Sequence, residues 1–165
     1  MGEKRPFISL SSACPHVLLT RQGVIVFNLR PNIGKISVDE NDKWRQSGGI
    51  FRRLFGQEPL GNPTSEIDKM VEAMAGYIRQ NAPTVEELPI GALIVFTTKG
   101  ATELDLENST IPAMRATKVK GFLRQQKREP LPKADYDALR AAFDEKSWRF
   151  GGVDPCRQSY LMFIV

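Results

Sequence analysis

Residues 13–36, ACPHVLLTRQGVIVFNLRPNIGKI, decide the fold expected for this chain of 165 residues. Two apolar runs, 16–20 and 24–29, flank the tripeptide Arg21-Gln22-Gly23. Glycine readily adopts the positive φ that a tight turn needs, so the stretch predicts a β-hairpin. Half-buried strands alternate between apolar and polar residues, and these runs do not alternate. They therefore predict strands that are buried on both faces.

The second run ends in Asn28, Leu29 and Arg30. Side chains alternate between the two faces of a strand, so Asn28 and Arg30 are expected to point the same way. A polar pair on an apolar strand needs partners, because burying polar groups without them is costly. The end of this strand is therefore the predicted functional site.

The same stretch resembles the central hairpin of the nuclease-related domain (NERD), a branch of the restriction-endonuclease-like superfamily. In that family the first strand opens with Asp, before a His and an apolar run. The second strand follows a Gly and ends in Glu, any residue, Lys. Residues 15–20 match the first strand and residues 23–30 match the second, and Gly34 and Ile36 fit the continuation.

The catalytic positions of the family carry other residues in this chain. Pro15 stands where the family has Asp, Asn28 where it has Glu, and Arg30 where it has Lys. The resemblance is strongest over residues 13–145 and leaves the tail, 146–165, outside it.

The resemblance implies an α/β, restriction-endonuclease-like fold in which a mixed central sheet is flanked by helices. The length of the chain predicts that residues 1–165 form a single domain. The family usually has an amphipathic helix before its sheet, and the sequence leaves no room for one. We expect that the chain is a fragment of a longer parent protein or has lost this helix. A short first strand is expected at 7–10.

Downstream of the hairpin, a third strand is expected at 35–38 and an acidic turn at 39–42, and Trp44 should pack against the sheet. Residues 47–61 are rich in glycine and lack a sustained period, so they predict a loop, with one turn of helix at 50–55. This loop is either plainly packed on the body or forms a basic flap over a nucleic-acid groove.

Asn62-Pro63 predicts the start of the longest helix, with Asn62 as N-cap and Pro63 in the first helical position. Its apolar residues follow one stripe of helical period, which indicates a core face rather than a cofactor site. The helix should end near Asn81, before Pro83. The stripe consists of Ile67, Met70, Val71, Met74, Tyr77 and Ile78.

The remaining elements follow the family order. A two-sided buried strand is expected at 92–98, an edge strand at 103–106 and a short parallel strand at 111–114. A helix at about 117–126 should turn Val119, Phe122 and Leu123 inward. A last helix starting at Pro132 should turn Tyr136, Leu139 and Phe143 inward.

A nuclease of the superfamily needs two carboxylates to hold Mg²⁺ and a Lys to orient water or stabilise charge. The cation binds oxygen anions and lowers the pKa of its bound water. Pro15 has no side-chain oxygen, Asn28 offers only a neutral carbonyl, and Arg30 is too basic to act as a general base. We therefore expect no metal site and no cofactor at these positions.

Glu66 leaves one enzyme alternative open. It lies in the first turn of the long helix, where it either complements the helix dipole or supplies a migrated catalytic acid. In the second case the chain would be a divergent Mg²⁺-dependent nuclease. Without the two family acids, Arg30 needs a partner, so we expect an Arg30–Glu66 ion pair within about 4 Å at the family metal site.

Basic residues favour nucleic acid as a partner. The net charge is +4, and residues 115–128 hold six basic residues and no acid. Residues 43–57 hold four more basic residues and no acid. A solvated basic surface is the default explanation for each of these two stretches. The residues expected to contact nucleic acid are Arg30, Lys35, Arg52, Arg53, Lys118, Arg124 and Lys127.

Several other classes are disfavoured. No apolar run approaches the roughly 20 residues of a membrane span, and the first residues do not form a signal peptide. Cys14 and Cys156 have no metal-ligand spacing and fit a reduced, cytoplasmic protein. His16, the one histidine, is interpreted as structural.

The sequence thus predicts a NERD-like domain that is not an active enzyme and serves as a nucleic-acid-binding or scaffolding module. The alternatives are the Glu66 nuclease and a protein-interaction module that uses the loop and the tail.

Overall fold

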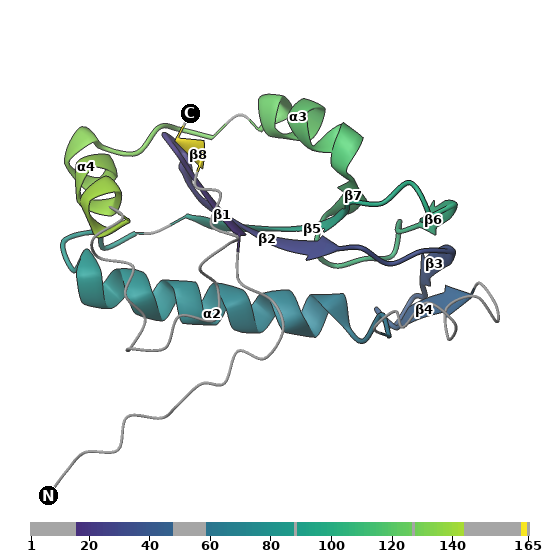
Figure 1. Cartoon of the computed structure of the whole chain (residues 1–165). Coiled ribbons are helices and arrows are strands. Elements are labelled where there is room, and N and C mark those ends of the chain that lie inside the picture. Colours follow the sequence, from purple (N-terminus) through teal and green to yellow (C-terminus); the bar gives the residue numbers. More distant parts are fainter. Residues whose placement is uncertain (1–15, 48–58, 88, 127, 144–162, 165) are drawn as a thin grey trace, which may run out of the picture.

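The computed structural model describes residues 16–47, 59–87, 89–126, 128–143 and 163–164, which form an α/β protein with two mixed sheets and three helices (Figure 1). The five-stranded sheet has the order β7-β5-β2-β1-β8, and the three-stranded sheet has the order β4-β3-β6. The elements are β1 (His16–Thr20), β2 (Gly23–Arg30), β3 (Lys35–Val38), β4 (Trp44–Ser47), α2 (Pro63–Asn81), β5 (Ile90–Phe96), β6 (Glu103–Asp105), β7 (Ala113–Arg115), α3 (Ala116–Gln125), α4 (Lys133–Ala142) and β8 (Phe163–Ile164).

The predicted hairpin is confirmed. β1 pairs antiparallel with β2, with Leu18 opposite Ile25. Gly23 has a φ of 133°, and a Cβ at this position would lie 2.3 Å from the carbonyl oxygen of Pro89. The turn therefore needs glycine for its conformation and for the close approach of a second segment.

The long helix is also confirmed at both ends. The Asn62 side chain caps α2 by accepting a hydrogen bond from the Ser65 amide at 3.0 Å, and Pro63 is the first helical residue. Four stripe residues are buried against the sheet, and Tyr77 donates its hydroxyl to the carbonyl of Ala142 at 2.6 Å. The stripe therefore forms the core face of α2, as predicted; its buried members are Ile67, Met70, Met74 and Ile78.

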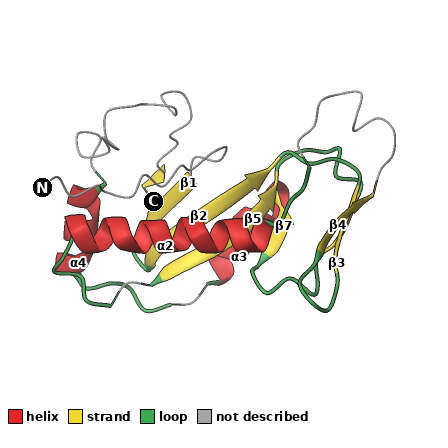
Figure 2. Cartoon of the chain, turned by 90° about the horizontal axis from the view of Figure 1, so that it is seen from below, coloured by secondary structure: helices red, strands yellow, loops and turns green. Residues whose placement is uncertain are grey.

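The two faces of the large sheet are covered unequally. α2 packs on β2 and β5, whereas α3 lies on the opposite face and packs on β5 and β7 (Figures 1 and 2). Residues 93–96 of β5 are fully buried, as expected for a two-sided strand. β1 and β2 are not buried on both faces as predicted, because the short helix α3 packs on β5 and β7 rather than on them: Ile25, Phe27 and Leu29 stay partly exposed.

The prediction of a single central sheet is wrong in one respect, because β3 belongs to a second sheet. β2 runs parallel to β5 up to Arg30, opposite Phe96. Pro31, which lacks an amide hydrogen, and Gly34, with a φ of 89°, follow. β3 then pairs with β4 and β6. The strand β4 was not predicted, and the expected loop at 47–61 overlaps its last residue.

The later elements differ from expectation mainly in their ends. β5 and β7 are displaced by about two residues from the predicted 92–98 and 111–114. Pro132 is the N-cap of α4 rather than its first residue. Leu139 and Phe143 are buried as predicted. Val119, Phe122 and Leu123 of α3 are partly buried, and no residue of this helix is fully buried.

Several predictions fall outside the described residues. These are the strand at 7–10, Pro15 at the family Asp position, the helical turn at 50–55, the basic residues Arg52, Arg53 and Lys127, both cysteines, and most of the tail. In the described part of the chain, no helix combines the length and apolar character needed to cross a membrane.

Candidate functional site

The end of β2 carries a buried polar residue, Asn28, that faces the start of α2. The side chains of Val24, Val26, Asn28 and Arg30 share one face of the strand, as the alternation predicts. Asn28 is only 1% exposed, and its Nδ2 donates a hydrogen bond to the carbonyl oxygen of Pro63 at 3.2 Å. This bond ties the strand end to the first turn of the helix.

Arg30 forms the predicted ion pair with Glu66. Arg30 Nη2 lies 2.7 Å from Glu66 Oε2 and also donates to the carbonyl oxygen of Leu60 at 3.0 Å. The Arg30 side chain is 12% exposed and the Glu66 side chain 39%. The cation is therefore almost enclosed, whereas the carboxylate reaches solvent.

The local sequence places Glu66 at this point. Asn62 fixes the start of α2, so Glu66 falls in the first turn, where its charge also complements the helix dipole. Gly61 precedes the cap with a φ of 64°, and a Cβ on it would lie 3.0 Å from Glu66 Oε1. A residue larger than glycine would therefore crowd the carboxylate that pairs with Arg30.

Trp44 packs next to the contacts between the end of β2 and the first turn of α2. Its ring lies 6.2 Å from that of Phe96 at the end of β5, which confirms the predicted packing against the sheet. Its Nε1 also donates to Thr64 Oγ1 at 2.8 Å, and Thr64 belongs to the first turn of α2. The Trp44–Thr64 contact was not predicted, because it joins residues far apart in the sequence. The carbonyl acceptors of Leu60 and Pro63 were not predicted either, because backbone groups carry no residue-type signal.

The structure does not bring the other predicted contact residues to Arg30. Lys35 lies on β3 of the second sheet, 2.6 Å from Glu103, and this hydrogen bond raises the pKa of Lys35. Lys118 and Arg124 are exposed on α3, on the opposite face of the sheet from α2 (Figure 2). His16 lies on β1, where its backbone is opposite Phe27.

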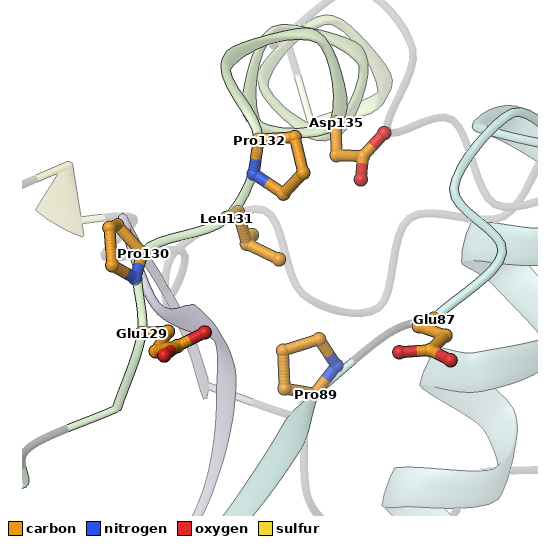
Figure 3. A pocket seen from close by; sticks show the side chains of 7 residues that line it. All are labelled: Glu87, Pro89, Glu129, Pro130, Leu131, Pro132 and Asp135. Carbon is orange, nitrogen blue, oxygen red and sulfur yellow. The ribbon is translucent and has the colours of Figure 1, made fainter.

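A pocket opens at the other end of the large sheet. Its lining includes Pro89, the residue before β5, whereas Arg30 pairs with Phe96 at the end of β5. Figure 3 shows proline rings and Leu131 around the hollow, together with carboxylates from different segments. This pocket was not predicted from the sequence; it is lined by Glu87, Pro89, Glu129, Pro130, Leu131, Pro132 and Asp135.

The donor set at the end of β2 consists of one amide, one guanidinium and one carboxylate that is already paired. Among the described residues, no group of three or more His, Cys, Asp or Glu side chains is arranged to hold a metal ion. Comparison of the chain with protein-family models, with curated proteins and with solved structures gives no match.

Proposed function

We propose that this chain is a nucleic-acid-binding module with a restriction-endonuclease-like fold, in which the position of the nuclease metal site is occupied by an ion pair. The Arg30–Glu66 contact carries the first part of this proposal. The exposed basic residues of α3 support the second part.

The arrangement of the elements supports the finer fold proposal. The antiparallel hairpin β1–β2 is followed in the sheet by β5, which runs parallel to β2. The helix α2 lies between β2 and β5 in the sequence, and it starts with Asn62-Pro63 beside the end of β2. This is the order that the resemblance to NERD implies. The second sheet, β4-β3-β6, is an addition at one end of this core.

The contacts of Arg30 and Glu66 argue against hydrolysis by the family mechanism. A Mg²⁺ site needs oxygen anions, and the carboxylate of Glu66 is held by a guanidinium that would repel the cation. Asn28 adds only a neutral oxygen, and its nitrogen is bound to Pro63. Arginine has no free lone pair to accept a proton, so Arg30 cannot serve as a general base.

The exposed basic residues of α3 support binding to phosphates. Lys118, Lys120 and Arg124 are exposed on this helix, and residues 111–126 contain no acid. Clustered cations on one surface attract the nucleic-acid backbone without regard to sequence. This surface lies on the opposite face of the sheet from Arg30, so binding there does not require the ion pair to open.

A cleavage assay tests the absence of catalysis. Purified protein with Mg²⁺ or Mn²⁺ should leave plasmid and linear DNA intact. Cleavage that disappears in Glu66→Ala would contradict the proposal and favour the divergent nuclease, in which Mg²⁺ displaces Arg30 from Glu66.

A salt-dependent titration against duplex DNA, single-stranded DNA and RNA tests the binding surface. The affinity should fall steeply between about 50 and 200 mM salt. Lys118→Ala with Arg124→Ala should reduce the slope of log K against log salt by roughly one for each phosphate contact that is lost.

The matched control is Lys69→Ala with Arg79→Ala, which removes two exposed basic residues from α2 on the other face. This variant should keep the wild-type slope. Equal losses in both variants would show only a nonspecific effect of net charge. A protein without binding at low salt would contradict the nucleic-acid proposal and leave a protein-interaction module as the better explanation.

A further inference from the structure

The exposed side of α3 has no side chain at its centre, because residue 121 is glycine. Gly121 is exposed, and a Cβ built on it would meet no other segment of the described structure within 4 Å. Its φ is not positive, so the backbone conformation does not require glycine. Glycine also lowers the stability of a helix interior relative to alanine. Close approach of a ligand to the backbone is a common reason for glycine at such a position.

The residues around Gly121 all carry hydrogen-bond donors. On a helix, the residues three and four positions away are the neighbours on the surface. Side chains of the types found here are those that contact phosphate oxygens in complexes with nucleic acid. The four neighbours are all exposed, and they are Thr117, Lys118, Arg124 and Gln125. Two cations, a hydroxyl and an amide therefore surround an open patch of helix backbone.

A second glycine within a helix lies in a different setting. A Cβ on Gly76 of α2 would also meet no other segment of the described structure within 4 Å. Its neighbours at the same spacings are Glu72, Ala73, Arg79 and Gln80. The acid offsets the one cation, so this patch of backbone does not favour an anion. Gly76 is therefore the natural control for Gly121.

The exposed side of α3 lacks an aromatic ring. Phe122, the one aromatic residue of this helix, shares the opposite, partly buried side with Val119 and Leu123. Proteins that bind unpaired strands stack bases on exposed aromatic rings. A duplex instead presents a dense row of phosphates, with one negative charge per about 1.7 Å of its axis. The surface around Gly121 therefore suits the backbone of a duplex better than an unpaired strand.

We propose that α3 binds the phosphate backbone of a duplex nucleic acid, with Gly121 at the point of closest approach. The missing side chain lets the duplex come close to the helix, so that the donors on both sides of Gly121 reach phosphates at the same time. The contact reads no bases and is open to DNA and RNA duplexes. This inference rests on the proposed function and specifies its surface and the form of the nucleic acid.

Gly121→Leu in the full chain tests the close approach. Leucine favours the helix, adds bulk, and carries neither a charge nor a hydrogen-bonding group. The midpoint of thermal unfolding should stay unchanged or rise. The affinity for DNA and RNA duplexes should fall by about tenfold or more at low salt, with a smaller slope of log K against log salt. Gly76→Leu, the matched control, should keep the wild-type affinity and slope.

The possible results separate this inference from the proposed function. Wild-type binding to duplexes that Gly121→Leu leaves unchanged, or that both leucine variants weaken equally, would overturn the inference alone. Tighter binding to single-stranded DNA than to a duplex of the same length would also overturn it. A wild-type protein that binds no nucleic acid at low salt would contradict the proposed function and the inference together.

An NMR titration of the wild-type protein gives a readout that does not depend on the folding of a variant. On addition of a short duplex, the amide signal of Gly121 should shift, because the phosphates approach its backbone. The amide signal of Gly76 should stay in place. A duplex that binds without shifting the Gly121 signal would overturn the inference.

Discussion

Replacing Glu66 by Gln tests whether the ion pair stabilises the junction between β2 and α2. The change keeps the size of the side chain and removes its charge. Breaking a fully buried ion pair costs about 3–5 kcal/mol, and breaking an exposed one at most about 1 kcal/mol. Arg30 is 12% exposed but Glu66 is 39% exposed, so solvent screens one side of the pair.

The expected loss therefore lies between these limits, at about 1.5 kcal/mol. The hydrogen bond from Arg30 to Leu60 remains, and the glutamine can still accept from the guanidinium. For a chain of this length, such a loss lowers the midpoint of thermal unfolding by about 3–6 °C. Urea unfolding, monitored by circular dichroism, measures the change in the free energy of unfolding directly.

Glu72→Gln is the matched control. Glu72 lies on the same helix, is exposed, and has no ion pair among the described residues. It should change the free energy of unfolding by no more than about 0.5 kcal/mol. If Glu66→Gln also stays within this range, the ion pair does not stabilise the fold and the reasoning is refuted.

Three further substitutions test other contacts. Trp44→Phe keeps the ring beside Phe96 but loses the hydrogen bond to Thr64, so urea unfolding should show a loss of about 1 kcal/mol; an unchanged stability would contradict the bond. Ile67→Ala, in the core face of α2, should cost about 2–5 kcal/mol by the same measurement, and a loss below 1 kcal/mol would argue against close packing there. Asp39 accepts a hydrogen bond from the Lys43 amide, which lowers the pKa of its carboxyl below 3.8. Asp39→Asn should therefore be less stable than wild type near neutral pH, the difference should vanish as the pH falls below 3.8, and a carbon NMR titration should place the Asp39 midpoint below that value.

The hairpin and α2 could be predicted closely because their signals are local. Gly23 between two apolar runs specifies the turn, and Asn62-Pro63 specifies the start of the helix. The Arg30–Glu66 pair followed from two local signals and from the resemblance to NERD. Alternation puts Asn28 and Arg30 on one face of β2, and the cap puts Glu66 in the first turn of α2. The resemblance implies that this helix packs beside the end of the strand. A buried cation beside that turn has few other partners, which is why a contact between residues so far apart in sequence was predictable.

The second sheet was not predictable in the same way. The strand β4 has the sequence WRQS, which carries no strand pattern of its own. It forms because β3 turns away from β2 after Pro31 and Gly34 and presents a free edge to it. Pairing between strands depends on the path of the chain after such a turn. The residues of β4 alone do not determine that path.

The sequence by itself therefore determined the elements with strong periods, their caps, and the polar pair at the end of β2. Only the tertiary structure decided that α3 lies on the face opposite Arg30, and that Asn28 and Arg30 are held by the carbonyl groups of Pro63 and Leu60. The physical reason is that turn and helix signals act over a few residues. The choice of a sheet face and the use of a backbone carbonyl depend on the packing of distant segments, and the carbonyl is the same for every residue type.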